Sequence, residues 1–207
     1  MTLADLKNEV RSKAKSVSRD HSCLVGLSGI DASGKGYVAK KLSDELESIG
    51  FRVASINVDC WLNLPEVRFG GNDPGHHFYI NALRLNEMFE HLVLPLKFTR
   101  SVRLTMNIAE ETATAFRPQT FDFNGIDILL LEGILIFKRE FVTNFDLKIW
   151  VECSFEKALE RAIARRQENL SPEATIDAYE KIYFPAQKIH FDRDDPVRSA
   201  DLIYSNQ

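Results

Sequence analysis

A glycine-rich loop between a short apolar run and a helical pattern constrains this chain most. Residues 29–36, GIDASGKG, have the spacing G-x-x-x-x-G-K. Residues 22–28 form the apolar run before the loop, and apolar side chains recur at helical spacing over residues 38–46 after it. In such a strand–loop–helix unit, backbone N–H groups converge on phosphate oxygens and the start of the helix adds positive potential. The loop therefore predicts a phosphate cradle for a nucleotide, with an ordinary glycine turn as the alternative.

The cradle supplies a lysine but lacks one hydroxyl. Lys35 provides a positive charge for the β- and γ-phosphates, whereas the next position, which usually carries a Ser or Thr that touches Mg²⁺, is Gly36. Glycine cannot ligate a metal, so water or a carboxylate fills that coordination position, or Mg²⁺ is bound weakly. The residues that we expect to contact the nucleotide here are Gly29, Ile30, Asp31, Ala32, Ser33, Gly34, Lys35, Gly36 and Tyr37.

Strand-like and helix-like segments alternate along the chain. We expect strands at residues 22–28, 51–58, 127–132, 146–151 and 200–204, and helices at 3–19, 35–49, 78–93, 155–167 and 171–190. Residues 61–75 are predicted to be a loop, and alternation within 97–123 hints at a hairpin. Near-continuously apolar strands indicate a parallel sheet with both faces covered. The predicted fold is α/β, a three-layer α/β/α sandwich of the P-loop NTPase type with a five-stranded, mostly parallel sheet.

Length and composition limit the class of protein. At 207 residues, one domain spanning 1–207 is expected, beginning with a helix within residues 1–20. A net charge of −4 gives no general attraction to nucleic acid or to a membrane surface, so phosphate binding must be local. Three scattered cysteines and the absence of a signal-peptide pattern favour the cytoplasm. The sequence leaves open whether the protein forms a homo-oligomer.

Two carboxylates follow predicted strands, where parallel sheets bind ligands. Asp59 comes after the second strand and is our candidate for the base that accepts the proton of an acceptor hydroxyl, with a turn cap as the alternative. Glu132 ends the third strand and is expected to face Mg²⁺ or its water shell; a structural ion pair is the alternative. Asp59 is also a candidate for the metal, directly or through water.

Basic and aromatic residues provide the remaining candidates. Arg161 and Arg165 are four apart on one predicted helix and are expected to stabilise transferred charge, although a solvated basic face explains them equally well. Arg198, just before the last strand, is expected to flank the nucleotide base. The expected acceptor-binding residues, besides Asp59 and Glu132, are Trp61, Arg68, His77 and Tyr79.

From residue 20 onward, the chain resembles the uridine kinase/phosphoribulokinase family of P-loop kinases. The resemblance is carried by GLSGIDASGKG (26–36), NVDCW (57–61), FGGNDPGHHFY (69–79), DILLLEGILIF (127–137), FEKALERAIARR (155–166) and DPVRSADLIYSN (195–206). It implies ATP on the loop, Mg²⁺ near Glu132, a base at Asp59, and an arginine-bearing helical lid with its following helix at about 160–192. It also implies that residues 195–201 border the adenine.

Two functions follow, from different classes. The first is an ATP-dependent kinase that phosphorylates a hydroxyl of a small molecule. The second, motivated by Gly36, is a nucleotide-binding module with little or no transfer. Residues 97–123 lack the Tyr-Asp-Phe…His pattern with which uridine kinases hold the nucleobase. The acceptor therefore stays open between a nucleoside, a sugar, a sugar phosphate and a glycerate- or pantothenate-like alcohol.

Overall fold

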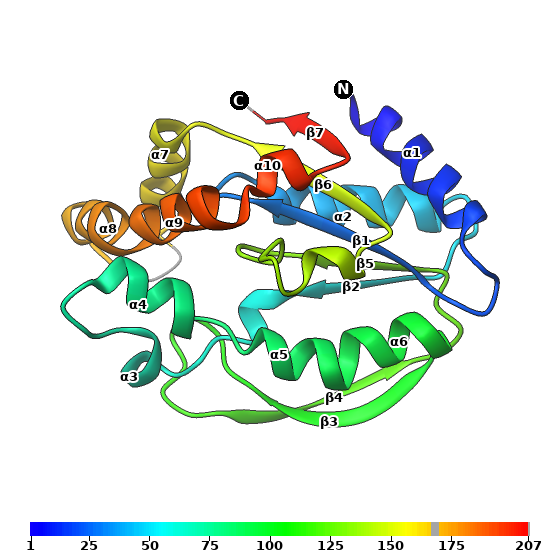
Figure 1. Ribbon diagram of the computed structural model, residues 1–207, viewed down its shortest axis with the longest axis horizontal. Helices are drawn as coiled ribbons and strands as arrows, with labels where there is room; N and C mark the ends of the chain where they lie inside the picture. Colours follow the sequence, from blue (N-terminus) through cyan, green and yellow to red (C-terminus); the bar gives the residue numbers. More distant parts are fainter. Residues whose placement is uncertain (167–169, 207) are drawn as a thin grey trace.

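Five parallel strands form the centre of the molecule. A computed structural model describes residues 1–166 and 170–206. The strands are β1 (Cys23–Gly29), β2 (Val53–Asn57), β5 (Ile128–Glu132), β6 (Leu147–Glu152) and β7 (Leu202–Ser205), in the spatial order β2-β5-β1-β6-β7 (Figure 1). The predicted α/β sheet is confirmed, and all of its strand pairs are parallel. Because β1 lies between β5 and β6, the loop after β1 opens at the point where the order of strands reverses.

Two helices cover one face of this sheet. Helices α1 (Leu3–Ser16) and α2 (Lys35–Glu47) pack against each other, with α1 at the upper right of Figure 1 and α2 beside the strands. Their apolar stripes, which include Leu6, Val10, Leu42 and Leu46, pack against β1, β5 and β6. The predicted amphipathic patterns therefore bury one stripe of each helix, as expected for an outer layer.

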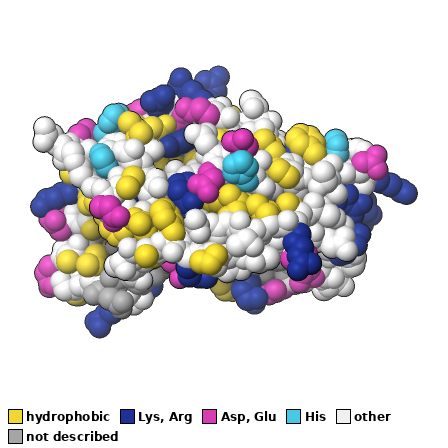
Figure 2. Space-filling view, turned by 90° about the horizontal axis from the view of Figure 1, so that it is seen from below, with side chains coloured by type: hydrophobic (Ala, Val, Ile, Leu, Met, Phe, Trp, Pro, Cys, Tyr) yellow, Lys and Arg dark blue, Asp and Glu magenta, His cyan; other side chains and the backbone are white. Residues whose placement is uncertain are grey.

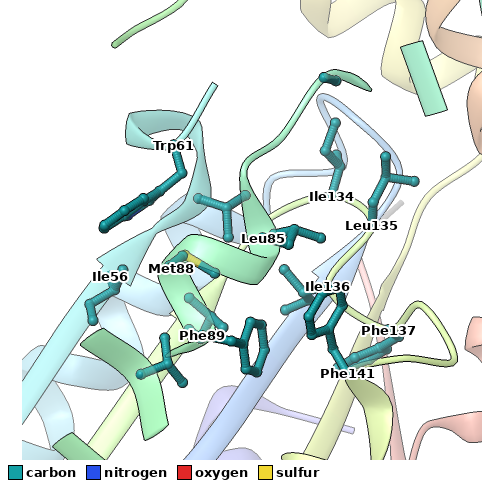
Figure 3. Close-up of a cluster of buried hydrophobic side chains, with 14 of the residues drawn as sticks. Ile56, Trp61, Leu85, Met88, Phe89, Ile134, Leu135, Ile136, Phe137 and Phe141 are labelled. Atoms are coloured by element: carbon teal, nitrogen blue, oxygen red, sulfur yellow. The ribbon is translucent and has the colours of Figure 1, made fainter. Parts of the chain in front are cut away.

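The opposite face carries the larger core. Helices α4 (Pro74–Asn81), α5 (Leu85–Met88) and α6 (Leu94–Thr99) lie below the sheet, and a wider helical turn, η2 (Phe89–Val93), joins α5 to α6. Figure 3 shows Met88 and Phe89 facing the side chains of the segment that follows β5, among them Ile136 and Phe141. The rings of Phe89 and Phe141 stack with centroids 4.6 Å apart.

The C-terminal third adds the helices that border the cradle. Helices α7 (Phe155–Arg165), α8 (Pro172–Ala178) and α9 (Phe184–Asp194) lie at the left of Figure 1, and a wider turn, η4 (Tyr179–Tyr183), joins α8 to α9. The short helix α10 (Pro196–Ser199) leads into β7. The predicted segments at 155–167 and 171–190 are helical over 155–165 and 172–190; part of the expected lid, residues 167–169, lies outside the described residues.

The segment from 61 to 93 differs from the prediction. Residues 61–75 contain helix α3 (Pro65–Arg68) and the start of α4, each with a proline in its first turn. The predicted helix 78–93 is interrupted after α4, because Asn63 N donates to Ala82 O and Arg84 N donates to Trp61 O. These two bonds draw the chain beside residues 61–63 and out of the helix.

The hairpin suggested by the alternation is present. Strands β3 (Val102–Ile108) and β4 (Arg117–Phe123) pair antiparallel and lie below the helices in Figure 1. Figure 2 views the molecule from this lower side and shows basic and acidic side chains interspersed, with apolar patches between them. None of the helices among the described residues is long and apolar enough to cross a bilayer.

Candidate active site

The loop after β1 forms a tight cradle. Gly34 has a φ of +86°, which favours glycine, and a Cβ there would lie 2.3 Å from Nδ2 of Asn206 and displace that amide. Lys35, the first residue of α2, is only 7% exposed, and Ser33 is fully buried. The Ser33 Oγ has no hydrogen-bond partner among the described residues. An unpartnered hydroxyl beside a buried lysine at a helix start fits a bound phosphate group.

Three carboxylates surround Lys35 and differ in their proton affinity. Burial raises the pKa of the Glu132 carboxyl to about 7, and the charges of Asp59 and Asp31 act in the same direction against Lys35. Burial likewise raises the pKa of Asp59. Burial also works against ionisation of Asp31, but Lys35, Arg165 and the Tyr179 hydroxyl outweigh it, so the pKa of Asp31 is lowered. The site therefore holds one firmly ionised carboxylate and two that take up a proton more readily.

Glu132 lies where the loop lacks its hydroxyl. A Cβ built on Gly36 would be 3.4 Å from Oε1 of Glu132 and 3.9 Å from Oε2. The carboxylate of β5 thus occupies space next to the position from which a Ser or Thr side chain would project. No group of three His, Cys, Asp or Glu side chains within 1–166 and 170–206 could hold a metal ion. The carboxylates of Glu132 and Asp59 fit the way in which proteins usually bind Mg²⁺, through one or two carboxylates together with water and nucleotide phosphates.

Asp31 ties the cradle to the helices that follow β6. Its carboxylate accepts hydrogen bonds from the Tyr179 hydroxyl and from Nη2 of Arg165, the latter at 3.3 Å. Its backbone N–H donates to Oε1 of Gln187 at 3.3 Å. The loop is therefore held by α7, η4 and α9 at once. Tyr179 and Gln187 carry no motif that distinguishes them in the sequence.

A second set of bonds fixes the C-terminal side of the cradle. Nη1 of Arg161 donates to Ser33 O at 3.1 Å, and its Nη2 donates to Asn206 O at 2.9 Å. The side-chain amide of Asn206 also donates to Ser33 O, at 2.7 Å. Arg161 therefore contacts the loop backbone, and Asn206, which follows β7, completes the site. The sequence signal that could have pointed to Asn206 is its position directly after the last strand.

A pocket opens beside Asp59. The apolar side chains of Leu62, Phe78 and Ile134 line it, together with Asp31, Asp59, Arg68, Glu111, Tyr183 and Gln187. Its cavity volume is about 40 Å³ in this conformation, which is small for a small-molecule site. The charge of Lys35 acts on the pKa of both Asp31 and Asp59, so the pocket that these two residues line adjoins the cradle.

Comparisons with known proteins agree with this geometry. Uridine kinases from Cronobacter sakazakii and Proteus mirabilis are each 26% identical to the chain, over 81% and 80% of its length and 80% and 79% of theirs. In sequence the chain is similar to these uridine kinases, and its fold is that of P-loop kinases. A solved structure described as a possible uridine kinase from Bacillus stearothermophilus matches with a TM-score of 0.75 and 18% identity, over 97% of this chain and 99% of that one. No protein-family model matches the chain.

Several predicted residues of this uridine kinase-like chain lie away from the pocket. Trp61 is fully buried and stacks on Phe121 with centroids 5.9 Å apart, so it cannot touch an acceptor in this conformation. The Tyr79 hydroxyl donates to Asp194 at 2.6 Å, and Nε2 of His77 lies 2.8 Å from Val67 O. These three side chains shape the scaffold around the site.

The two remaining nucleotide candidates are exposed. Tyr37 is 70% exposed on the first turn of α2, and Arg198 is exposed on α10. Both are accessible to solvent beside elements that border the cradle, because α2 begins at Lys35 and α10 leads into β7 and Asn206. Their expected roles toward the nucleotide stay predictions.

Proposed function

We propose that the protein is an ATP-dependent kinase that phosphorylates a hydroxyl group of a small molecule. The observation that carries the proposal is the position of Asp59, which lines a small pocket and lies within electrostatic reach of the buried Lys35. A phosphate cradle alone would account for nucleotide binding. A carboxylate in an adjoining pocket adds a group that can accept a proton from an alcohol.

Each residue of the site has a separate task in this proposal. ATP, when bound with Mg²⁺, supplies the γ-phosphoryl group: the bond from phosphorus to the β-phosphate oxygen breaks, the bond to the acceptor oxygen forms, and ADP leaves. Asp59 takes the proton of the acceptor hydroxyl, and its raised pKa makes it a stronger proton acceptor than an ordinary carboxylate. Lys35 neutralises negative charge on the phosphates, while Arg165 is held next to the loop by its hydrogen bond to Asp31.

Metal binding is assigned to Glu132. Its carboxylate is buried at the end of β5, beside Gly36. We propose that it orients Mg²⁺ directly or through water and so replaces the absent hydroxyl of the loop. Asp59 is positioned to share the same water shell.

The test is a transfer screen with a matched pair of variants. Mg-ATP is offered with nucleosides, sugars, hydroxy acids and polyols, and phosphorylated product is measured for the wild type, Asp59→Asn and Asp44→Asn. Asp44 lies on the exposed side of α2, where it pairs with Lys40, and serves as the control. Asp59→Asn should lower turnover by about 10²–10⁴-fold while ADP still shifts the melting temperature. Wild-type turnover in Asp59→Asn would remove Asp59 from the chemistry.

Gly36 supports a second candidate, a nucleotide-binding module without efficient transfer. Gly36→Ser separates the two functions, because it restores the hydroxyl beside Glu132. If Glu132 already provides the coordination, the dependence of nucleotide affinity on Mg²⁺ should change little. A gain in Mg²⁺-dependent affinity of about tenfold or more, the size of effect seen when groups around a metal are altered, would favour the binding module.

A further inference from the structure

Arg68 is a buried cation in the wall of the pocket. It is the last residue of α3, is only 5% exposed, and lines the same pocket as Asp59. One of its terminal nitrogens donates to the backbone oxygen of Glu111, and its guanidinium lies over the Phe69 ring, 4.9 Å from the centroid. These contacts hold the group in place.

The Nε of Arg68 is left without a partner. It is buried and forms no hydrogen bond with any described residue. An arginine keeps its charge throughout the ordinary pH range, so an unsatisfied donor on a buried guanidinium is costly unless a ligand completes it. The pocket is where such a ligand would enter.

Arg84 shows that an unpartnered Nε by itself does not define a site. Its Nε is also buried without a partner, but its terminal nitrogens bind Glu87 at 2.8 Å and Asn107 O at 2.6 Å. Arg84 does not line the pocket beside Asp59. The location of Arg68 is thus the deciding observation, and Arg84 provides a matched control.

The unpaired Nε–H of Arg68 points to one class of ligand. Among the described residues of the lining, Arg68 is the basic one, and the lining also contains the acidic residues Asp31, Asp59 and Glu111. A single guanidinium matches one negative charge, and its planar donors suit the two oxygens of a carboxylate. A doubly charged phosphate group would face the repulsion of the acidic side chains with only one cation beside it.

We propose that the phosphate acceptor is a hydroxy acid, a small alcohol whose carboxylate binds Arg68 while its hydroxyl faces Asp59. The inference rests on the proposed kinase function and narrows the acceptor. The transfer is the same as above: the acceptor oxygen bonds to the γ-phosphorus, ADP leaves, and the hydroxyl proton passes to Asp59. Arg68 takes no part in proton transfer and acts on the affinity for the acceptor.

The experiment compares matched acceptors. Glycerol is paired with glycerate, glucose with gluconate, and glycerol 3-phosphate provides the phosphate-bearing member. The kcat/KM of each is measured with Mg-ATP for the wild type, Arg68→Met, Arg68→Lys and the control Arg84→Met. In the wild type, at least one acid should exceed its neutral partner by about 10–100-fold, the effect expected of a hydrogen-bonded charge pair.

The variants test whether Arg68 causes this preference. Arg68→Met should bring the acid down to the level of its neutral partner, whereas Arg84→Met should keep the preference. If Arg68→Met does not fold, Arg68→Lys carries the test. It keeps the charge but loses the Nε–H, so it should raise KM for the acid alone, without lowering kcat.

Each contrary result has one meaning. Equal use of acids and neutral alcohols, or a preference that survives both Arg68 variants, overturns the hydroxy-acid inference and leaves the kinase intact. Better use of the phosphate-bearing alcohol than of the acids overturns the carboxylate assignment. Failure to phosphorylate any alcohol, with ADP still bound, overturns the proposed kinase and this inference with it.

Discussion

Replacing Glu132 by glutamine should make the metal-free protein more stable, and the gain should depend on pH. The buried carboxyl of Glu132 has a pKa of about 7, against an ordinary value of 4.5. Glutamine has nearly the same shape and cannot ionise. The variant therefore removes the cost of burying this charge while it leaves the packing at the end of β5 unchanged.

The direction follows from proton binding. Below pH 4.5 the carboxyl is neutral in both the folded and the unfolded chain. Between pH 4.5 and 7 the folded chain keeps a proton that the unfolded chain has released, so the free energy of unfolding falls as the pH rises. Above pH 7 the carboxyl is ionised in both the folded and the unfolded chain, and the full free-energy cost of burying its charge remains. At about 1.4 kcal/mol for each pH unit, the interval between 4.5 and about 7 corresponds to about 3 kcal/mol.

Urea unfolding of both proteins measures this cost. The free energy of unfolding is determined from pH 5 to pH 8.5 in the presence of a chelator, since Mg²⁺ would stabilise the ionised carboxylate. The difference between Glu132→Gln and the wild type should grow by up to about 3 kcal/mol across this range. Glu152→Gln is the control, because Glu152 also ends a strand, β6, but is exposed.

A constant difference would refute the reasoning. If the gain in Glu132→Gln is the same at pH 5 and pH 8.5, the wild-type carboxyl ionises in the folded protein as easily as in the unfolded chain. The same conclusion follows if Glu152→Gln reproduces the pH dependence.

Two further substitutions test the framework of the site. Gly133→Ala should destabilise the protein by about 1–3 kcal/mol or prevent folding, because the added Cβ would lie 1.9 Å from Cγ2 of Val58; urea unfolding checks this, and wild-type stability would contradict it. Asp31→Asn should lower the free energy of unfolding at pH 7 by about 1–2 kcal/mol, because it weakens the bonds to Arg165 and Tyr179. Since the pKa of Asp31 is lowered, this loss should shrink as the pH falls below about 4, and a loss that persists at pH 3 would argue against an ionic contribution.

The sequence was sufficient where a single stretch of chain carries the signal. The apolar run of β1, the glycine-rich loop and the helical spacing of α2 predicted the cradle, and the same kind of pattern predicted five strands and the hairpin. Asp59 and Glu132 could be chosen because parallel strands present their carboxyl ends at one edge of the sheet. These inferences depend on periodicity and backbone geometry, which a local sequence encodes.

The break between α4 and α5 was missed because its cause is not local. Residues 82–84 continue a helical pattern, yet hydrogen bonds with residues 61–63, some twenty positions earlier, draw them out of the helix. Trp61 and Tyr79 were assigned to the acceptor for a related reason. Their sequence positions lie near the site, but their side chains turn into the core and toward Asp194.

Only the tertiary structure decided the neighbours of each functional side chain. Gly36 by itself marked a missing hydroxyl; the fold places the carboxylate of Glu132, 96 residues later, against that position. In the sequence Asp31 is an ordinary position of the loop motif; the fold brings the side chains of Tyr179 and Arg165 into hydrogen-bonding contact with it. Arg68 became informative once its burial beside Asp59 was known. Such contacts join residues that are distant in the chain, and they arise from packing of the layers, which no local pattern specifies.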